Sequence, residues 1–192
     1  MVGRTVDAVF DVDELVADCR TALGEAEPRR AVREVLDRGL ATPNELAEVL
    51  DPQEGGLNLL HHAPDLTVIH VVWAPGMVLH PHDHRMWAVI GIYTGAEDNA
   101  FFRRPSPDSK TLVESGGKRL EVSDTVVLGD DVIHQVSNPV SKLTGAIHVY
   151  GGDFVNQPRS QWGDPPYEEH PWEMGEAQQQ FADANAAWRA QS

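Results

Sequence analysis

The pattern of hydrophobic and polar positions divides the chain into a helical beginning and a β-rich body. In residues 1–55, apolar side chains recur at helical spacing, as in the step from Leu15 to Cys19. Thr42 followed by Pro43 is typical of a helix start, because threonine caps the first turn and proline fits its first position. We therefore expect a cap of short helices in this part.

From about residue 57, short β-branched or aromatic runs follow one another, each bounded by Gly, Pro, Asp or Asn. They include the segments LTVIHVVW, WAVIGIYT and TGAIHVY. Strands at this spacing, with no helical pattern between them, predict an antiparallel sandwich or a small barrel. The tail from Glu173 to Gln191 again has the spacing of a helix.

The size of the chain favours a single domain. Its 192 residues, of which 41% are hydrophobic, are enough for one core and too few for two of ordinary size. We expect one domain over residues 1–192, made of a helical cap (1–55), a β-barrel (57–160) and a C-terminal loop and helix (161–192).

The net charge and the cysteine content limit the classes of binding partner and the cellular compartment that we expect. Fifteen basic against 30 acidic residues give a formal net charge of -15, which repels the phosphates of nucleic acids. Cys19 has no second cysteine to pair with, and neither a secretory leader nor an apolar run of membrane-spanning length is evident. We expect a cytoplasmic monomer or homodimer that binds a small molecule and neither nucleic acid nor membrane.

The histidines suggest a metal site. In the segment GMVLHPHDH, His82 and His84 are two residues apart, so on a strand their side chains share a face while Asp83 points the other way. His134 follows a turn-like Gly-Asp-Asp run further on. A single inward histidine is commonly a hydrogen-bonded core residue, but adjacent buried imidazoles without a metal leave polar atoms unsatisfied. Imidazoles that converge in this way suit a transition metal.

These residues resemble the two motifs of the cupin superfamily. The match consists of G-x5-H-x-H from Gly76 to His84, of Gly95, and of His134 followed by Asn138. The glutamate usual in cupins falls at Ala88, which offers no ligand atom. The resemblance implies a mainly β fold, the cupin double-stranded β-helix (jelly-roll) barrel, with an N-terminal helical cap and a C-terminal helix.

A cupin with three histidines and no carboxylate resembles the thiol dioxygenases, namely cysteine dioxygenase and 3-mercaptopropionate dioxygenase. The phrase HDHRMWAVIGIYTGAEDN is similar to the bacterial 3-mercaptopropionate type, and the resemblance covers roughly residues 66–160. It implies one Fe(II) per chain, held by His82, His84 and His134. The implied reaction is the oxidation of a small thiol acid by O2 to its sulfinate.

The same resemblance supplies candidate catalytic and substrate-binding residues. The family's Ser-x-His-x-Tyr segment aligns with residues 146–150, so His148 and Tyr150 are the candidate catalytic residues. Arg159 stands where the mercaptopropionate enzymes place a carboxylate-binding arginine, and a guanidinium fork suits that task. We add His80 and Trp87 as candidate substrate contacts, with His80 at the barrel mouth because Pro81 bends the strand.

Departures from the family pattern leave alternatives open. Ala146 replaces the serine, Val89 replaces the cysteine that crosslinks in animal enzymes, and no arginine lies near Leu57, which makes cysteine a poor substrate. One alternative is an iron-dependent hydroxylase of a larger, natural-product-like substrate, with His70 and further imidazoles holding a second metal. The other is a non-catalytic cupin that binds a ligand or a metal. Spacing alone does not identify the metal, since three histidines also form zinc hydrolase sites.

Overall fold

Residues 10–191 are described by a computed structural model, in which three helices precede the strands and one follows them. The helices are α1 (Val12–Ala22), α2 (Pro28–Gly39), α3 (Pro43–Leu50) and α4 (Met174–Arg189). The strands are β1 (Gly56–Ala63), β2 (Leu66–Trp73), β3 (Val78–Asp83), β4 (Ala88–Thr94), β5 (Ala96–Arg103), β6 (Val113–Glu121), β7 (Thr125–Leu128), β8 (Ile133–Ser137), β9 (Thr144–Tyr150), β10 (Ser160–Trp162) and β11 (Glu169–Pro171).

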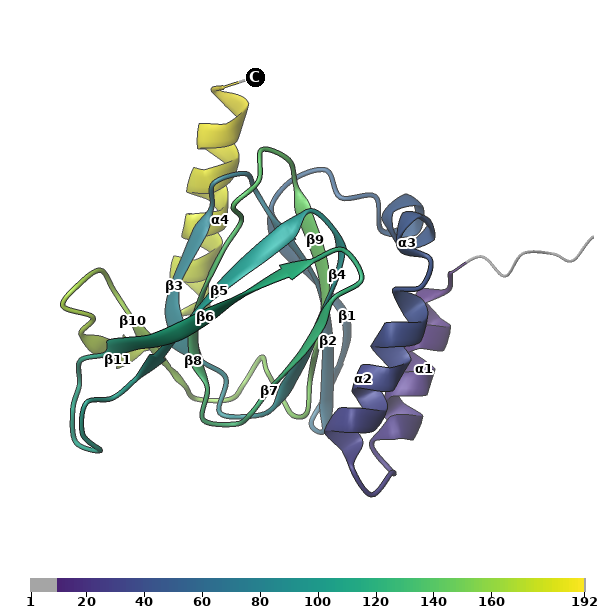
Figure 1. The fold of residues 1–192 in the computed structure, drawn as a ribbon, viewed down its shortest axis with the longest axis horizontal. Coiled ribbons are helices and arrows are strands. Elements are labelled where there is room, and N and C mark those ends of the chain that lie inside the picture. Colours follow the sequence, from purple (N-terminus) through teal and green to yellow (C-terminus); the bar gives the residue numbers. More distant parts are fainter. Residues whose placement is uncertain (1–9, 192) are drawn as a thin grey trace, which may run out of the picture.

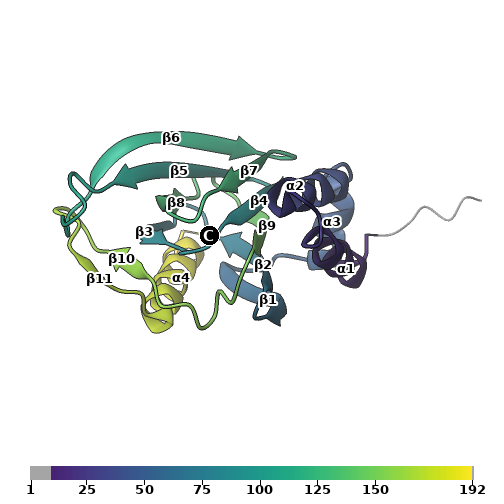
Figure 2. The same cartoon turned by 90° about the horizontal axis from the view of Figure 1, so that it is seen from below.

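The strands form two antiparallel sheets in jelly-roll order. One sheet runs β1-β2-β9-β4-β7 and the other runs β11-β10-β3-β8-β5-β6. From β2 to β9 the chain fills these two sheets in the sequence of an eight-stranded double-stranded β-helix, the architecture of the cupins. Figures 1 and 2 show the sheets enclosing a common interior. The predicted fold class, with its helical cap and C-terminal helix, is confirmed.

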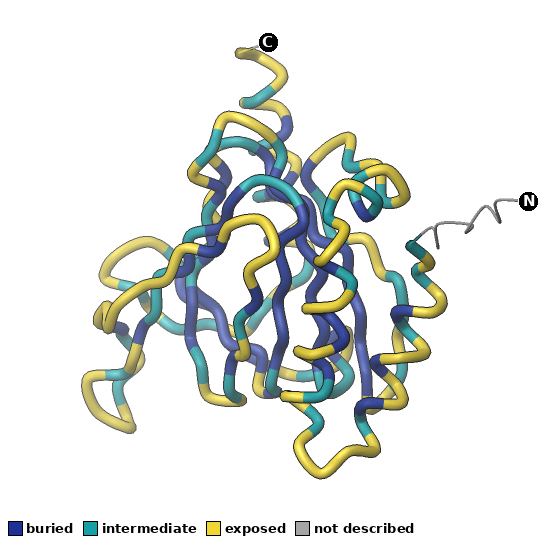
Figure 3. The backbone as a smooth tube through the Cα atoms, turned by 45° about the vertical axis from the view of Figure 1, so that its right-hand side comes forward, coloured by how far each residue is buried: buried dark blue, intermediate teal, exposed yellow. Residues whose placement is uncertain are grey.

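The central strands of the first sheet, β2, β9 and β4, are buried on both faces, which explains their continuous hydrophobic sequences. Ile69, Val71 and Trp73 of β2 face the barrel interior, whereas Leu66 and Val68 pack outward. The outward side chains meet the buried faces of α1 and α2, which lie beside this sheet in Figure 1. Figure 3 shows the buried backbone concentrated in the strands of the barrel.

Two local expectations need correction. Thr42 stands at the N-cap of α3, but its side chain makes no capping hydrogen bond, so Pro43 at the first turn is the start signal that operates. The segment after residue 160 is not only a loop before the helix, because β10 and β11 form a short hairpin that extends the second sheet. Within residues 10–191, no helix is long and apolar enough to span a membrane.

Candidate metal centre

Three buried histidines meet inside the barrel. His82 lies on β3, His84 directly follows that strand, and His134 lies on β8 as the cross-strand partner of His82. One ring nitrogen of each lies within 4.8 Å of the others, and the Nε2 atoms of His84 and His134 are 3.3 Å apart. In residues 10–191 this is the one group of three or more potential metal ligands of this kind. It contains no carboxylate, and Ala88 is a buried residue of β4.

Backbone and amide groups orient two of these rings. His82 Nδ1 donates to the backbone oxygen of His80 at 2.9 Å, and His134 Nδ1 donates to Asn99 Oδ1 at 2.7 Å. Because the proton is on Nδ1 in both rings, both Nε2 atoms keep a lone pair. In histidines that bind metals, one ring nitrogen typically donates a hydrogen bond to the protein and the other presents its lone pair to the metal.

Burial also keeps the three imidazoles neutral. It lowers the pKa of His82 to about 4 and, together with the neighbouring histidines, holds the pKa values of His84 and His134 well below the usual value. Neutral imidazole is the form that coordinates a cation. The donor set therefore fits a divalent transition metal.

The cavity in front of the histidines is small and mostly apolar. Its volume is about 20 Å³, roughly the space that one water molecule needs. Its apolar wall is formed by the side chains of Leu57, Val71, Leu79, Val136 and Phe154. The remaining wall residues are Trp73, His148, Tyr150 and Trp172, so no acidic side chain of the described chain lines it.

Tyr150 and His148 share the inner face of β9 and reach this cavity. The Tyr150 hydroxyl lies 3.0 Å from His148 Nδ1, and the Tyr150 ring meets that of His84 edge-on with centroids 5.0 Å apart. Burial raises the pKa of Tyr150, so the hydroxyl keeps its proton at neutral pH.

Arg159 is buried beside the same site. Its guanidinium lies 4.0 Å from the ring centre of Phe154 and 4.6 Å from that of Trp172, both cavity residues. One nitrogen donates to the backbone oxygen of Phe154, whereas Nε and Nη2 have no hydrogen-bond partner. Burial lowers the pKa of Arg159 to about 10, which still leaves it charged at neutral pH. A buried cation with two unpaired nitrogen donors is suited to bind an anion.

Like Arg159, the other two candidate substrate contacts, His80 and Trp87, are not among the residues that line the cavity. The His80 side chain is 39% exposed, with Nε2 at 3.8 Å from an Asp164 oxygen, and His80 serves the site through its carbonyl group. Trp87 packs into the outer hydrophobic cluster against the helices, away from the histidines. Of these two residues, His80 thus contacts the candidate ligand His82 through its backbone, and Trp87 belongs to the outer cluster.

Two polar residues that sequence reasoning missed lie beside the site. Glu97 and Asn99 lie on the same face of β5, and Asn99 hydrogen-bonds His134 while Glu97 accepts from Trp73 Nε1 at 2.8 Å. The signal was present, because a glutamate two residues before an asparagine in a strand places two polar side chains on one face.

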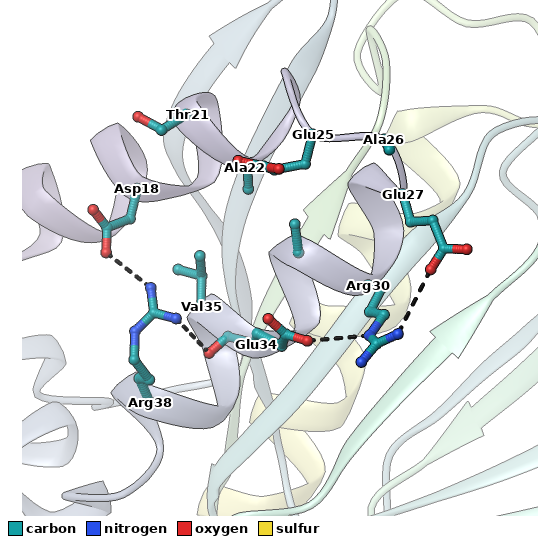
Figure 4. Close-up of a pocket in the computed structure, with 11 residues that line it drawn as sticks. Asp18, Thr21, Ala22, Glu25, Ala26, Glu27, Arg30, Glu34, Val35 and Arg38 are labelled. Carbon is teal, nitrogen blue, oxygen red and sulfur yellow. Dashed lines mark hydrogen bonds and ion pairs between the residues drawn. The ribbon is translucent and has the colours of Figure 1, made fainter.

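Larger hollows lie elsewhere on the molecule. A groove of about 580 Å³ runs between α1 and α2, and Figure 4 shows that charged side chains line it. Most of these charges are paired with one another, Arg38 with Asp18 and Arg30 with Glu27 and Glu34. None of the histidines lies in this groove, so its size does not mark it as the reaction site.

Comparison with known proteins adds little to this description. No protein-family model matches the chain. Among solved structures, it is similar to an RmlC-like cupin family protein from Methanocaldococcus jannaschii, at 13% identity and a TM-score of 0.45 over 54% of this chain and 85% of that one. A protein from Bacillus halodurans is similar at 10% identity and a TM-score of 0.48, over 56% and 77%.

An oxalate decarboxylase from Bacillus subtilis, in a variant form, also resembles the chain. The identity is 10% and the TM-score 0.42, over 53% of this chain and 26% of that protein. Similarities this low carry no argument about activity, so the fold rests on the strand order described above.

Proposed function

We propose that this chain is a non-haem iron oxidoreductase that uses O2 to oxidise a small thiol acid to its sulfinate, in the manner of the thiol dioxygenases. One observation carries the proposal. A group of three buried, neutral imidazoles without a carboxylate lies beside Arg159, a buried arginine with two unpaired nitrogen donors. The choice of iron rests on the resemblance of residues 66–160 to that family.

His82, His84 and His134 would hold the ion. Because all three ligands are neutral, a bound Fe(II) would keep its full positive charge, favour the thiolate form of a substrate and bring it together with O2. In the overall reaction both oxygen atoms of O2 end on sulfur, which is oxidised as O2 is reduced, and the thiol proton leaves to water.

Arg159 would select an acid. Its free Nε and Nη2 groups can donate two parallel hydrogen bonds to a substrate carboxylate. An ammonium group would find no acidic partner among the described residues that line the cavity. This difference favours a simple mercapto acid over cysteine, which carries an ammonium group as well as a carboxylate.

The walls of the cavity favour a small substrate. The side chains of Leu57 and Phe154 can cover a short hydrocarbon chain and keep water away from the thiol. A volume of about 20 Å³ requires the wall to move even for a small thiol acid, and it disfavours a large natural product. His148 would hold the Tyr150 hydroxyl at the reacting end.

The test is oxygen consumption by protein loaded with Fe(II) under anaerobic conditions. After addition of O2, uptake with 3-mercaptopropionate, cysteine and cysteamine is recorded and sulfinate is identified by mass spectrometry. We expect the highest rate with 3-mercaptopropionate. No uptake above that of the Fe(II)-treated His84→Ala protein with any thiol would rule the proposal out and favour a hydroxylase or a binding protein.

A further inference from the structure

Glu97 is a fully buried carboxylate that the reaction described above does not use. It lies on β5 with none of its surface exposed to solvent. Its two oxygens each accept one hydrogen bond, Oε2 from Trp73 Nε1 at 2.8 Å and Oε1 from Asn99 Nδ2 at 2.9 Å. A buried charge needs such donors, but the donors also connect Glu97 to the histidine site.

The first connection runs through Asn99 to His134. Because the Asn99 amide nitrogen donates to Glu97, its oxygen is turned toward His134 Nδ1, at 2.7 Å. An oxygen there requires a proton on Nδ1, which leaves the lone pair of His134 on Nε2, the nitrogen that faces His84.

The second connection runs directly to His148. Its Nε2 atom is buried without a hydrogen-bond partner and lies 3.7 Å from Glu97 Oε2. This distance is too long for a hydrogen bond, but the negative charge favours a proton on the nitrogen that faces it. His148 Nδ1 then accepts the hydrogen bond from the Tyr150 hydroxyl, at 3.0 Å.

We propose that Glu97 is a positioning residue that sets the tautomers of two imidazoles at once, placing the proton of His134 on Nδ1 and that of His148 on Nε2. The part that concerns His134, a candidate metal ligand, rests on the proposed function and deepens it. It also assigns a partner to His148, whose own strand carries Ala146 in place of a serine.

The substitution Glu97→Gln separates this role from simple packing, since it keeps the shape of the side chain. A glutamine has one oxygen where glutamate presents two acceptors. Trp73 can only donate, so it takes that oxygen, and the new amide nitrogen faces Asn99. Asn99 must then turn its oxygen to the glutamine and its nitrogen to His134, and the proton of His134 moves to Nε2, where it blocks metal binding.

Two measurements on the full chain test the inference without using thiol oxidation. In metal-free wild-type protein with isotope-labelled histidine, nitrogen NMR should find the Nδ1–H tautomer at His134 and the Nε2–H tautomer at His148. In Glu97→Gln the His134 tautomer should be reversed. The affinity for Co(II), followed by its absorption spectrum, should fall about 10- to 100-fold, the usual effect of losing a partner of a metal-binding histidine.

Glu114→Gln, on the exposed part of β6, is the matched control and should bind Co(II) like the wild type. An Nδ1–H tautomer at His148 in the wild type, or unchanged Co(II) affinity in a folded Glu97→Gln protein, would overturn the inference. If Glu97→Gln does not fold, the wild-type spectrum still decides. A chain that fails to oxidise thiols yet passes both tests would refute the proposed function and leave this inference standing.

Discussion

Asp83 and Ser160 join two strands that are far apart in the sequence. The Asp83 carboxylate accepts the backbone N–H of Ser160 at 2.8 Å, and its other oxygen pairs with Arg85. Asp83 stands between His82 and His84 but points away from them, as alternation on a strand predicts. The residue between two candidate ligands thus fastens the hairpin that follows Arg159.

Replacing Asp83 with alanine should loosen this junction. The buried Ser160 N–H would lose its acceptor, which costs about 1–3 kcal/mol of folding free energy. Urea unfolding of the metal-free protein measures the loss. Arg85→Ala is the control and should cost less, because the Arg85 side chain is 47% exposed. Equal stability of Asp83→Ala and wild type would contradict this role.

His84 and His80 should respond differently to alanine. His84→Ala removes one of three imidazoles and should abolish bound iron, measured by elemental analysis after loading and desalting. His80→Ala should retain iron, since His80 supports His82 through a backbone oxygen that alanine also has. Iron retained in His84→Ala, or lost in His80→Ala, would show that the ligand assignment is wrong.

Tyr150→Phe should separate metal binding from turnover. The phenyl ring keeps the packing against His84 but removes the hydroxyl next to His148. We expect unchanged iron content and a fall in turnover of about 100-fold, the scale of a lost positioned proton donor or acceptor. Wild-type turnover in this variant would refute a catalytic role for Tyr150.

Arg159→Met should affect substrates according to their charge. For the mercapto acid, loss of the charge-assisted hydrogen bonds to its carboxylate corresponds to about 1.5–3 kcal/mol, or a rise in KM of about 10- to 150-fold. Cysteamine has no carboxylate, so its KM should not rise. Steady-state oxygen uptake with each thiol provides the measurement. An equal effect on both thiols would argue against carboxylate recognition by Arg159.

His70 should make the metal-free protein sensitive to acid. It is buried against Tyr93, with Nε2 at 2.7 Å from the hydroxyl, and burial lowers its pKa to about 4. Below pH 6.5 His70 binds a proton in the unfolded chain, whereas in the folded protein it binds one only near pH 4. The free energy of unfolding therefore falls as the pH is lowered from 6.5 to about 4.

The double variant His70→Phe/Tyr93→Phe removes both polar partners together and should weaken this dependence by about 1.4 kcal/mol per pH unit. Unfolding free energies measured between pH 6.5 and 4 provide the test. His61→Phe, at a partly exposed position, serves as the control. Because burial also lowers the pKa values of His82, His84 and His134, part of the dependence should remain, but a slope unchanged from wild type in the double variant would exclude a contribution of His70.

Strand alternation explains much of what could be predicted. It places His82 and His84 on one face at the end of β3, and His148 and Tyr150 on one face of β9. Applied to β4 it would also have corrected the expectation for Trp87, because Ala88 and Ile90 face the interior while Val89 packs outward. Trp87 has the parity of Val89 and lies with it in the outer cluster.

The partners of Glu97 could not be predicted in this way. Asn99 reaches His134 because β5 and β8 are paired in the register that sets Phe101 opposite His134. A shift of one residue would reverse the faces, and no local pattern in either strand determines the pairing. The hairpin of β10 and β11 could not be predicted either, because strands of three residues are too short to show alternation.

The order of these elements along the chain affects how the site is made. His82, His84 and His134 all precede Phe154 and Trp172, two residues of the cavity wall, and Arg159, which packs against both. During synthesis on the ribosome, the imidazoles emerge before the residues that shield them from water. An ion that bound during synthesis would therefore do so before Phe154 and Trp172 complete the wall of the cavity.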